Sequence, residues 1–138
     1  MILSLILNFD VEIKRIKFGG DYIDVYKPKG EGKFPFVLFS GGMNSPSKRY
    51  ESFGKFLASN GYIVIIPDYK GWLFLLLIPF KILKILDNLE KIDSSIENKG
   101  CLGGHSLGAY YSLLVSYRRN SIKCVFLFSP PALFLNYN

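Results

Sequence analysis

A chain of 138 residues fits one domain, because domains usually hold roughly 100 to 200 residues, and its 49% hydrophobic content argues against disorder. The formal net charge of +6 comes from basic residues scattered among apolar stretches, so we expect a solvated basic surface and no nucleic-acid partner.

The first predicted elements are a hairpin and a buried strand. Apolar and charged residues alternate over positions 11–18, and Gly19-Gly20 then turns the chain into a second strand at 22–28. The run FPFVLFS at 34–40 is continuously apolar, which is typical of a strand covered on both faces of a parallel sheet.

A helix and another strand follow. Ser45 offers an N-cap and Pro46 a first helical position, and Asn60-Gly61 is a stop signal. Between them, three apolar residues repeat at helical spacing: Tyr50, Phe53 and Leu57. The apolar stretch YIVIIP at 62–67 is the next buried strand, which completes a strand–helix–strand unit.

The rest of the chain repeats this alternation. We predict a helix from Pro79 to about residue 92–95, a short strand at 99–104, a helix at 107–119 and a strand at 122–128. The helical residues expected on the buried face of 107–119 are large: Leu107, Tyr110, Tyr111 and Leu114. The whole pattern predicts an α/β three-layer sandwich, with a mostly parallel sheet of about six strands and helices on both faces.

The cysteines and the apolar runs indicate in which compartment the protein is expected. Cys101 and Cys124 are too few for a disulfide framework and lie in strand-like runs, so we expect buried free thiols, no metal and no cofactor. The first residues show no signal-peptide pattern, and a cytoplasmic protein is expected. Residues 71–80 are strongly apolar but fall short of the roughly 20 residues of a membrane span. We expect the stretch from Trp72 to Phe80 to be buried against the core, and the alternative is an apolar wall over a cleft.

The pattern Gly-His-Ser-Leu-Gly at 104–108 lies between a predicted strand and a predicted helix. That setting forces a tight, strained turn, which lifts the Ser106 hydroxyl to the carboxyl edge of the sheet as a nucleophile. Gly104 and Gly108 must be small because side chains there would collide with the neighbouring elements. The N–H of Leu107, at the start of the helix, can point at a developing oxyanion. The alternative is a purely structural glycine turn.

With this turn, the chain resembles the α/β-hydrolase superfamily, closest to the branch of dienelactone hydrolases, chlorophyllases and polyester hydrolases. Three segments carry the resemblance in the family's order and approximate spacing: 34–45, 57–69 and 100–114. The resemblance implies a partial α/β-hydrolase fold and acyl transfer through Ser106, with His105 as a packing residue of the turn.

The resemblance also implies a second oxyanion donor in the loop after the strand at 34–40. The family's loop usually reads His-Gly-x, and here Gly41 stands at the histidine, Gly42 at the glycine and Met43 at the donor. A backbone amide is the working group, so Met43 can serve, although the side chain that anchors the loop is lost. The alternative is a glycine-rich turn into a capped helix.

The catalytic acid and base are missing where the family has them. After Ser106 the chain contains no histidine, aspartate or glutamate, and residues 129–138 are too short for the family's last strands. Residues 1–138 are therefore expected to form a single domain that lacks the C-terminal strands. An isolated chain would keep only residual catalysis, roughly 10³ to 10⁴ over water, until a partner or further residues complete the site.

Three hypotheses about function follow. The first is a serine esterase or lipase-like hydrolase that acts on a small ester or acyl substrate. The second is a non-catalytic, truncated homologue that serves binding or assembly. The third and weakest is a protein that binds a membrane surface through residues 71–85. Because the strand at 122–128 would be an exposed apolar edge, we also expect a homo-oligomer that forms through it.

Overall fold

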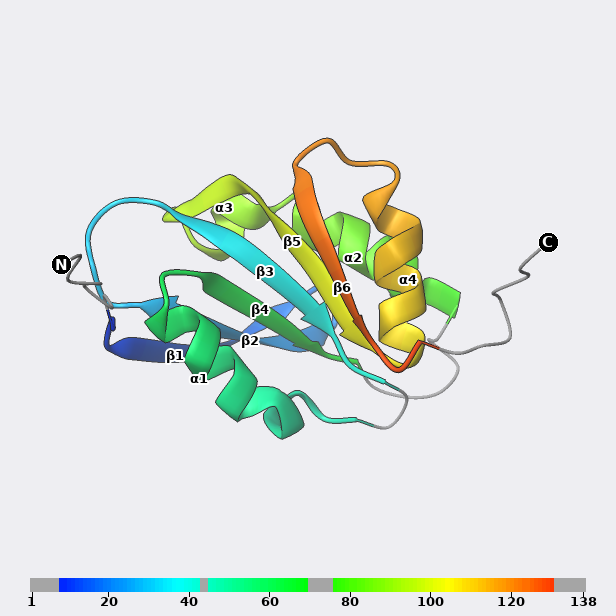
Figure 1. Cartoon of the computed structure of the whole chain (residues 1–138), viewed down its shortest axis with the longest axis horizontal. Helices are drawn as coiled ribbons and strands as arrows, with labels where there is room; N and C mark the ends of the chain where they lie inside the picture. The colour runs from blue at the N-terminus through cyan, green and yellow to red at the C-terminus, as the bar shows by residue number, and fades with distance from the viewer. Residues whose placement is uncertain (1–7, 43–44, 70–75, 131–138) are drawn as a thin grey trace, which may run out of the picture.

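One six-stranded sheet organises the protein, with the strand order β1-β2-β4-β3-β5-β6 (Figure 1). The computed structural model describes residues 8–42, 45–69 and 76–130. The strands are β1 (Val11–Phe18), β2 (Asp21–Pro28), β3 (Phe34–Ser40), β4 (Ile63–Asp68), β5 (Ile96–His105) and β6 (Ile122–Phe128). The helices are a 3₁₀ turn η1 (Ser47–Tyr50), α1 (Glu51–Ser59), α2 (Ile78–Leu86), α3 (Leu89–Ile92) and α4 (Leu107–Ser116).

The sheet is antiparallel at one side and parallel over the rest. β1 and β2 form the predicted hairpin, whose turn residues Gly19 and Gly20 both have positive φ. β2 pairs antiparallel with β4, whereas β4, β3, β5 and β6 run parallel. The predicted α/β sheet is therefore present, and the carboxyl ends of β3 and β5 meet at one edge.

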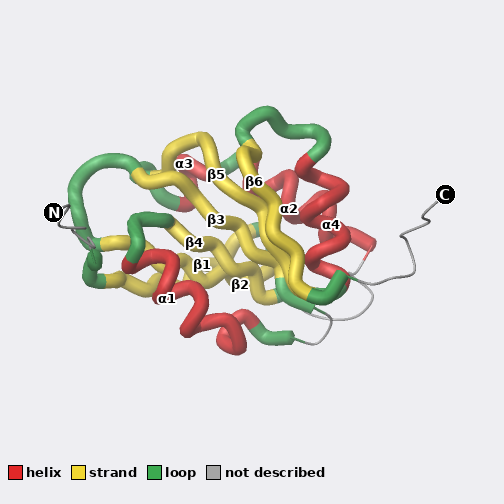
Figure 2. Tube along the Cα trace, in the orientation of Figure 1, coloured by secondary structure: helices red, strands yellow, loops and turns green. Residues whose placement is uncertain are grey.

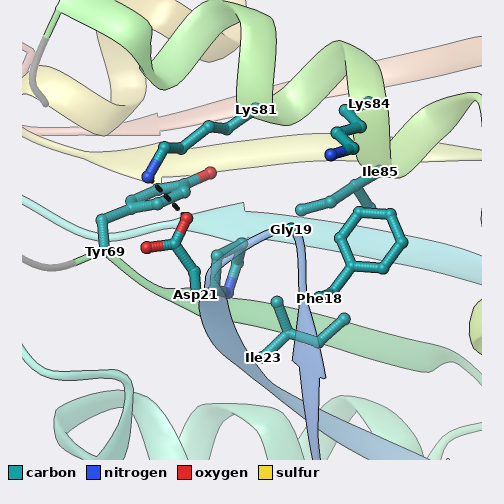
Figure 3. Close-up of a pocket in the computed structure, with 9 residues that line it drawn as sticks. Phe18, Gly19, Asp21, Ile23, Tyr69, Lys81, Lys84 and Ile85 are labelled. Carbon is teal, nitrogen blue, oxygen red and sulfur yellow. Dashed lines mark hydrogen bonds and ion pairs between the residues drawn. The ribbon is translucent and has the colours of Figure 1, made fainter.

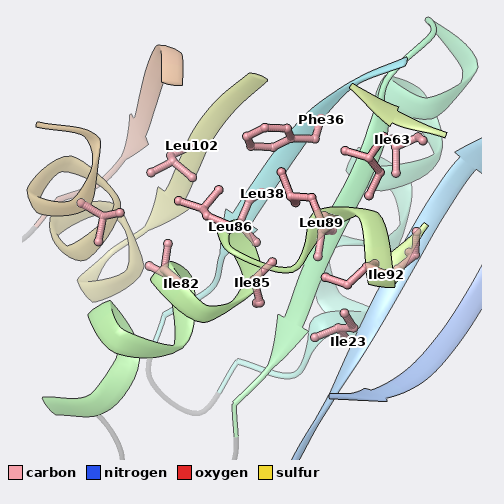
Figure 4. Close-up of a cluster of buried hydrophobic side chains, with 14 of the residues drawn as sticks. Ile23, Phe36, Leu38, Ile63, Ile82, Ile85, Leu86, Leu89, Ile92 and Leu102 are labelled. Carbon is pink, nitrogen blue, oxygen red and sulfur yellow. The ribbon is translucent and has the colours of Figure 1, made fainter. Parts of the chain in front are cut away.

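Helices cover both faces of the sheet, which gives three layers (Figure 2). On one face, Ala58 of α1 packs in a small cluster with buried residues from the strands: Tyr26, Val37, Phe39, Val64 and Ile66. On the other face, α2, α3 and α4 cover the larger cluster, in which Phe36, Leu38 and Leu102 of the strands meet Ile82 and Ile85 of α2 (Figure 4). Burial of this apolar surface is the main stabilising term.

Helix boundaries differ from the sequence prediction in three places, one of which is the end of α4 at Ser116 in place of residue 119. The segment after β3 begins with the 3₁₀ turn η1, and Ser45 makes no cap to it; its hydroxyl accepts a hydrogen bond from Arg49 at 3.2 Å. The predicted helix from Pro79 is broken into α2 and α3 at Asp87-Asn88, where the Asn88 side chain donates to the Lys84 carbonyl oxygen at 2.7 Å. Asn bonds of this kind compete with the helical ladder.

The prediction for the buried face of α4 was wrong. The helix buries Gly108, Ala109, Ser112 and Val115, while Leu114 is exposed. Small residues face inward because the helix approaches the backbone of β3 closely. A Cβ atom added at Gly108 would collide with the carbonyl oxygen of Ser40.

The expectation of two buried free thiols was also wrong. Cys101 and Cys124 are register partners on the parallel strands β5 and β6, with their Cα atoms 4.7 Å apart, and they form a disulfide bond. Neither residue is fully buried, and Cys124 is exposed. Sequence spacing could not show this pairing, because the two residues become neighbours only through the β5–α4–β6 crossover.

Strand β6 is the last strand of the sheet beyond β5, and four of its residues are half-buried and three exposed. Beside it, on the face that carries α1, lies an apolar groove of about 250 Å³. The groove is lined by Val37, Phe53, Leu57, Tyr62, Cys101, Cys124 and Phe126.

The segment expected to be buried at 71–80 is described only from Leu76. Of that part, Ile78 is buried, but Leu76 and Phe80 are 78% and 67% exposed, so core burial does not hold for them. No helix within the described ranges is long and apolar enough to cross a membrane.

Candidate active site

Ser106 lies at the sharp turn between β5 and α4, as the sequence pattern predicts. Its backbone has φ 56° and ψ −122°, a conformation that non-glycine residues rarely adopt. The turn is tied down at both ends: the Ser106 amide donates to the Phe128 carbonyl oxygen at 2.9 Å, and the Ala109 amide donates to the Ser106 carbonyl oxygen at 3.1 Å. The fold thus holds a strained serine at the carboxyl edge of the sheet.

The two flanking glycines are required by close backbone approach. A Cβ atom at Gly104 would collide with the backbone of Gly108 and Ala109, and one at Gly108 would collide with the Ser40 and Gly41 carbonyl oxygens. The structure therefore confirms the expectation that side chains at positions 104 and 108 would collide with neighbouring elements.

Leu107 is the first residue of α4, so its amide belongs to the first helical turn, where N–H groups lack an intrahelical acceptor. The helix dipole adds partial positive charge at this end. The amide next to Ser106 is consequently suited to bind an oxyanion. Its role as a donor stays a prediction.

The loop after β3 passes directly over the serine. A Cβ atom built at Gly42 would lie 3.3 Å from Ser106 Cβ and 3.3 Å from His105 Nδ1. The Gly42 carbonyl oxygen accepts a hydrogen bond from the Ser45 amide at 3.2 Å. Met43, the predicted second oxyanion donor, lies outside the described residues.

The His105 side chain contacts Tyr50. Its Nδ1 lies 3.3 Å from Tyr50 Oη, at the foot of the loop. Among the described residues, no side chain hydrogen-bonds to Ser106 Oγ. The described part of the chain therefore holds a serine and amides but no base beside them.

A half-buried tyrosine supports the base of the loop from the face of α2. Tyr69 Oη lies 3.3 Å from Ser40 Oγ, and burial raises the pKa of Tyr69 well above its ordinary value. Lys81 covers the Tyr69 ring and forms a 2.5 Å ion pair with Asp21 (Figure 3). The cavity these residues line measures about 20 Å³, room for one water and no substrate.

Asp68, the last residue of β4, makes structural contacts only. Its carboxylate accepts from Arg15 at 2.7 Å and from the Ser47 amide at 3.2 Å, and the hydrogen bond from Arg15 raises the pKa of that guanidinium. The Ser47 hydroxyl donates to Asp24 at 2.5 Å. This network anchors the start of η1, and so the end of the loop over Ser106.

Sequence reasoning missed Tyr50 and Tyr69 as parts of the site. In the sequence, Tyr50 is only one of three apolar residues at helical spacing, with Phe53 and Leu57. Within the described ranges, no group of three or more histidine, cysteine, aspartate or glutamate side chains could hold a metal ion.

The comparisons with known proteins address fold and family. An epoxide hydrolase from Vigna radiata is similar in structure, with a TM-score of 0.63 and 20% sequence identity over 88% of this chain. This chain spans 40% of the length of that protein, so the fold is a partial α/β-hydrolase fold. No curated protein matches the chain significantly in sequence. The family model named Chlorophyllase matches residues 8–87, well over half of the 138 residues and ending before Ser106. The chain therefore belongs to the chlorophyllase family of α/β-hydrolase-type proteins.

Proposed function

We propose that this chain supplies the nucleophile and the oxyanion-binding amides of a serine hydrolase that acts on small carboxylic esters. The observation that carries the proposal is the strained backbone of Ser106, at φ 56°, on a turn that opens directly into α4. Strained residues persist where function requires them, and a serine raised on such a turn is accessible to a carbonyl carbon.

The proposed chemistry is acyl transfer in two steps. Ser106 Oγ attacks the ester carbonyl carbon while a base takes its proton, and the alkoxide oxygen that develops is bound by the amides of Leu107 and Met43. The alcohol leaves with a proton, and water then releases the acid. The single histidine of the sequence, His105, contacts Tyr50, so we propose that the base comes from outside these 138 residues.

A small base added to the solution tests this proposal. Imidazole can accept the Ser106 proton, so a fluorophosphonate probe should label Ser106 faster as the imidazole concentration rises. The adduct is located by peptide mass spectrometry. Ser106→Ala should abolish the labelling, whereas Ser52→Ala, which changes an exposed serine on α1, should leave it unchanged.

The alternative is the non-catalytic module for binding or assembly. It is favoured by the absence of any described side chain hydrogen-bonded to Ser106 Oγ. If the folded chain gives no adduct on Ser106 at any imidazole concentration, the hydrolase proposal is wrong and the module is preferred. Hydrolysis of p-nitrophenyl esters is a second test: a hydrolase should lose this activity in Ser106→Ala, whereas a non-catalytic module should show no difference between wild type and the variant.

A further inference from the structure

The ring of Tyr50 occupies the space that a side chain at position 41 would take. A Cβ atom added at Gly41 would lie 2.7 Å from Tyr50 Cε2 and 3.1 Å from Tyr50 Oη, and all its nearest neighbours belong to Tyr50. Gly41 is not among the glycines with positive φ, so its backbone does not itself demand glycine. The small residue at 41 is matched to the large one at 50.

The hydroxyl of Tyr50 joins the loop to the nucleophile turn. The Gly42 amide donates to Tyr50 Oη at 3.3 Å, and the same oxygen lies 3.3 Å from His105 Nδ1. Oη accepts from Gly42, and it can donate its own proton to His105 when Nδ1 of that residue is unprotonated. The resulting chain of hydrogen bonds runs from the Gly42 amide through Tyr50 to the residue next to Ser106.

Tyr50 is itself held firmly by the sheet. It ends η1, and its ring packs on Phe39 of β3 with the centroids 4.8 Å apart. On the opposite face of β3, Tyr69 contacts Ser40. The base of the loop is thus fixed from both faces of the sheet.

We infer that Tyr50 is a positioning residue for the oxyanion loop: its ring replaces a side chain at position 41, and its hydroxyl fixes Gly42 above Ser106. This inference rests on the proposed function, because a fixed loop matters for catalysis only if its amides bind an oxyanion. The role is not catalytic, since Tyr50 acts on the loop and not on the substrate.

Removing only the hydroxyl tests the positioning role. Tyr50→Phe should lower the rate of Ser106 labelling by about five-fold, the factor that one neutral hydrogen bond represents. The melting temperature should change little, because the ring remains. Tyr62→Phe is the matched control, since Tyr62 is an exposed tyrosine on the groove beside β6, and it should label like wild type. Equal labelling of Tyr50→Phe and wild type would overturn the inference.

A double-mutant cycle tests the match between positions 41 and 50. Gly41→Ala alone should slow labelling and destabilise the fold, because the new methyl group collides with the Tyr50 ring. In the Tyr50→Ala background the same substitution should cost little, so the two effects should be strongly non-additive. An equal cost of Gly41→Ala in both backgrounds would show that Tyr50 does not fill this space.

A third measurement does not depend on labelling. His105 is the only histidine in the chain, so its imidazole ¹⁵N signals are assigned without overlap. In wild type, neutral His105 should carry its proton on Nε2, and Tyr50→Phe should shift the Nδ1 signal and speed hydrogen exchange of the Gly42 amide. If these signals respond but wild type is never labelled, the hydrogen-bond chain stands and the proposed function fails. If labelling occurs but neither signal responds to Tyr50→Phe, the inference fails alone.

Discussion

At the scale of single residues, the backbone strain at Ser106 lowers the stability of the fold while the turn presents the hydroxyl. A serine with φ 56° and ψ −122° costs about 1–3 kcal/mol relative to an ordinary backbone conformation. Contacts around the turn offset this strain, and they include the hydrogen bond from the Ser106 amide to the Phe128 carbonyl oxygen. A purely structural turn at this position would be better served by glycine.

This strain gives a prediction for stability. Ser106→Gly should be more stable than Ser106→Ala by about 1 kcal/mol, since both lose the hydroxyl but only glycine relaxes at positive φ. Urea unfolding of the two variants measures the difference. At Lys55, in the middle of α1, the order should reverse, because alanine exceeds glycine in a helix by about 1 kcal/mol. Equal stability of the two Ser106 variants would show that the turn is unstrained.

Residue patterns predicted the turn but not its surroundings. Gly104, Ser106 and Gly108 lie within five consecutive residues, so their spacing alone indicates a strand–turn–helix junction. Tyr50 lies eight positions beyond Gly42, and its apolar ring fits a helical repeat equally well. Only the missing side chain at Gly41 was a signal that another residue must fill the loop.

At the scale of elements, hydrophobic periodicity predicted every strand, but it joined α2 and α3 into one helix and misjudged the buried face of α4. The inward side of α4 carries Gly108, Ala109 and Ser112 because the helix lies close to the backbone of β3 and β5, and Ser112 donates to the Gly103 carbonyl oxygen at 2.9 Å. Periodicity weighs size and apolarity, so it favoured the large residues on the opposite side. Close packing is a property of two elements together, which one segment of sequence does not contain.

The β5–β6 disulfide gives a prediction at this scale. Cys101 and Cys124 are 23 residues apart, and closing a loop of that length stabilises a fold by about 3 kcal/mol through the unfolded chain. Reduction should therefore lower the free energy of unfolding of wild type by about this amount, measured in urea with and without dithiothreitol. The double variant Cys101→Ser/Cys124→Ser should not respond to the reductant. If dithiothreitol also left the free energy of unfolding of wild type unchanged, the disulfide between Cys101 and Cys124 would be contradicted.

The same bond bears on where the protein acts. Reducing compartments keep thiols free, whereas disulfides persist in oxidising ones. The cytoplasmic location expected from the sequence stays a prediction. Alkylation of thiols after rapid acid quenching of cells would separate a reduced pair from an oxidised one.

At the scale of the whole molecule, the sheet leaves β6 as an edge with apolar residues on it. This chain spans 40% of the length of the epoxide hydrolase that it resembles, and β6 is the last strand in its order. Phe128 is 49% exposed at the end of that strand, near the groove of about 250 Å³ that Phe126 and the disulfide help to line. An exposed strand edge of this kind favours pairing with another chain.

We therefore expect the purified chain to self-associate through β6. Light scattering across a dilution series should give a mass that rises from one copy towards two, because the backbone groups on the outer side of the strand gain partners and the apolar side chains lose contact with water. Phe128→Lys should shift the equilibrium to the monomer, since a charge on the edge would have to be desolvated. Phe56→Lys, an equal change at a 65% exposed residue on α1 and away from this edge, should leave the association unchanged. A mass of one copy at every concentration, or equal weakening by both lysines, would remove β6 as the interface and leave this edge to a different polypeptide.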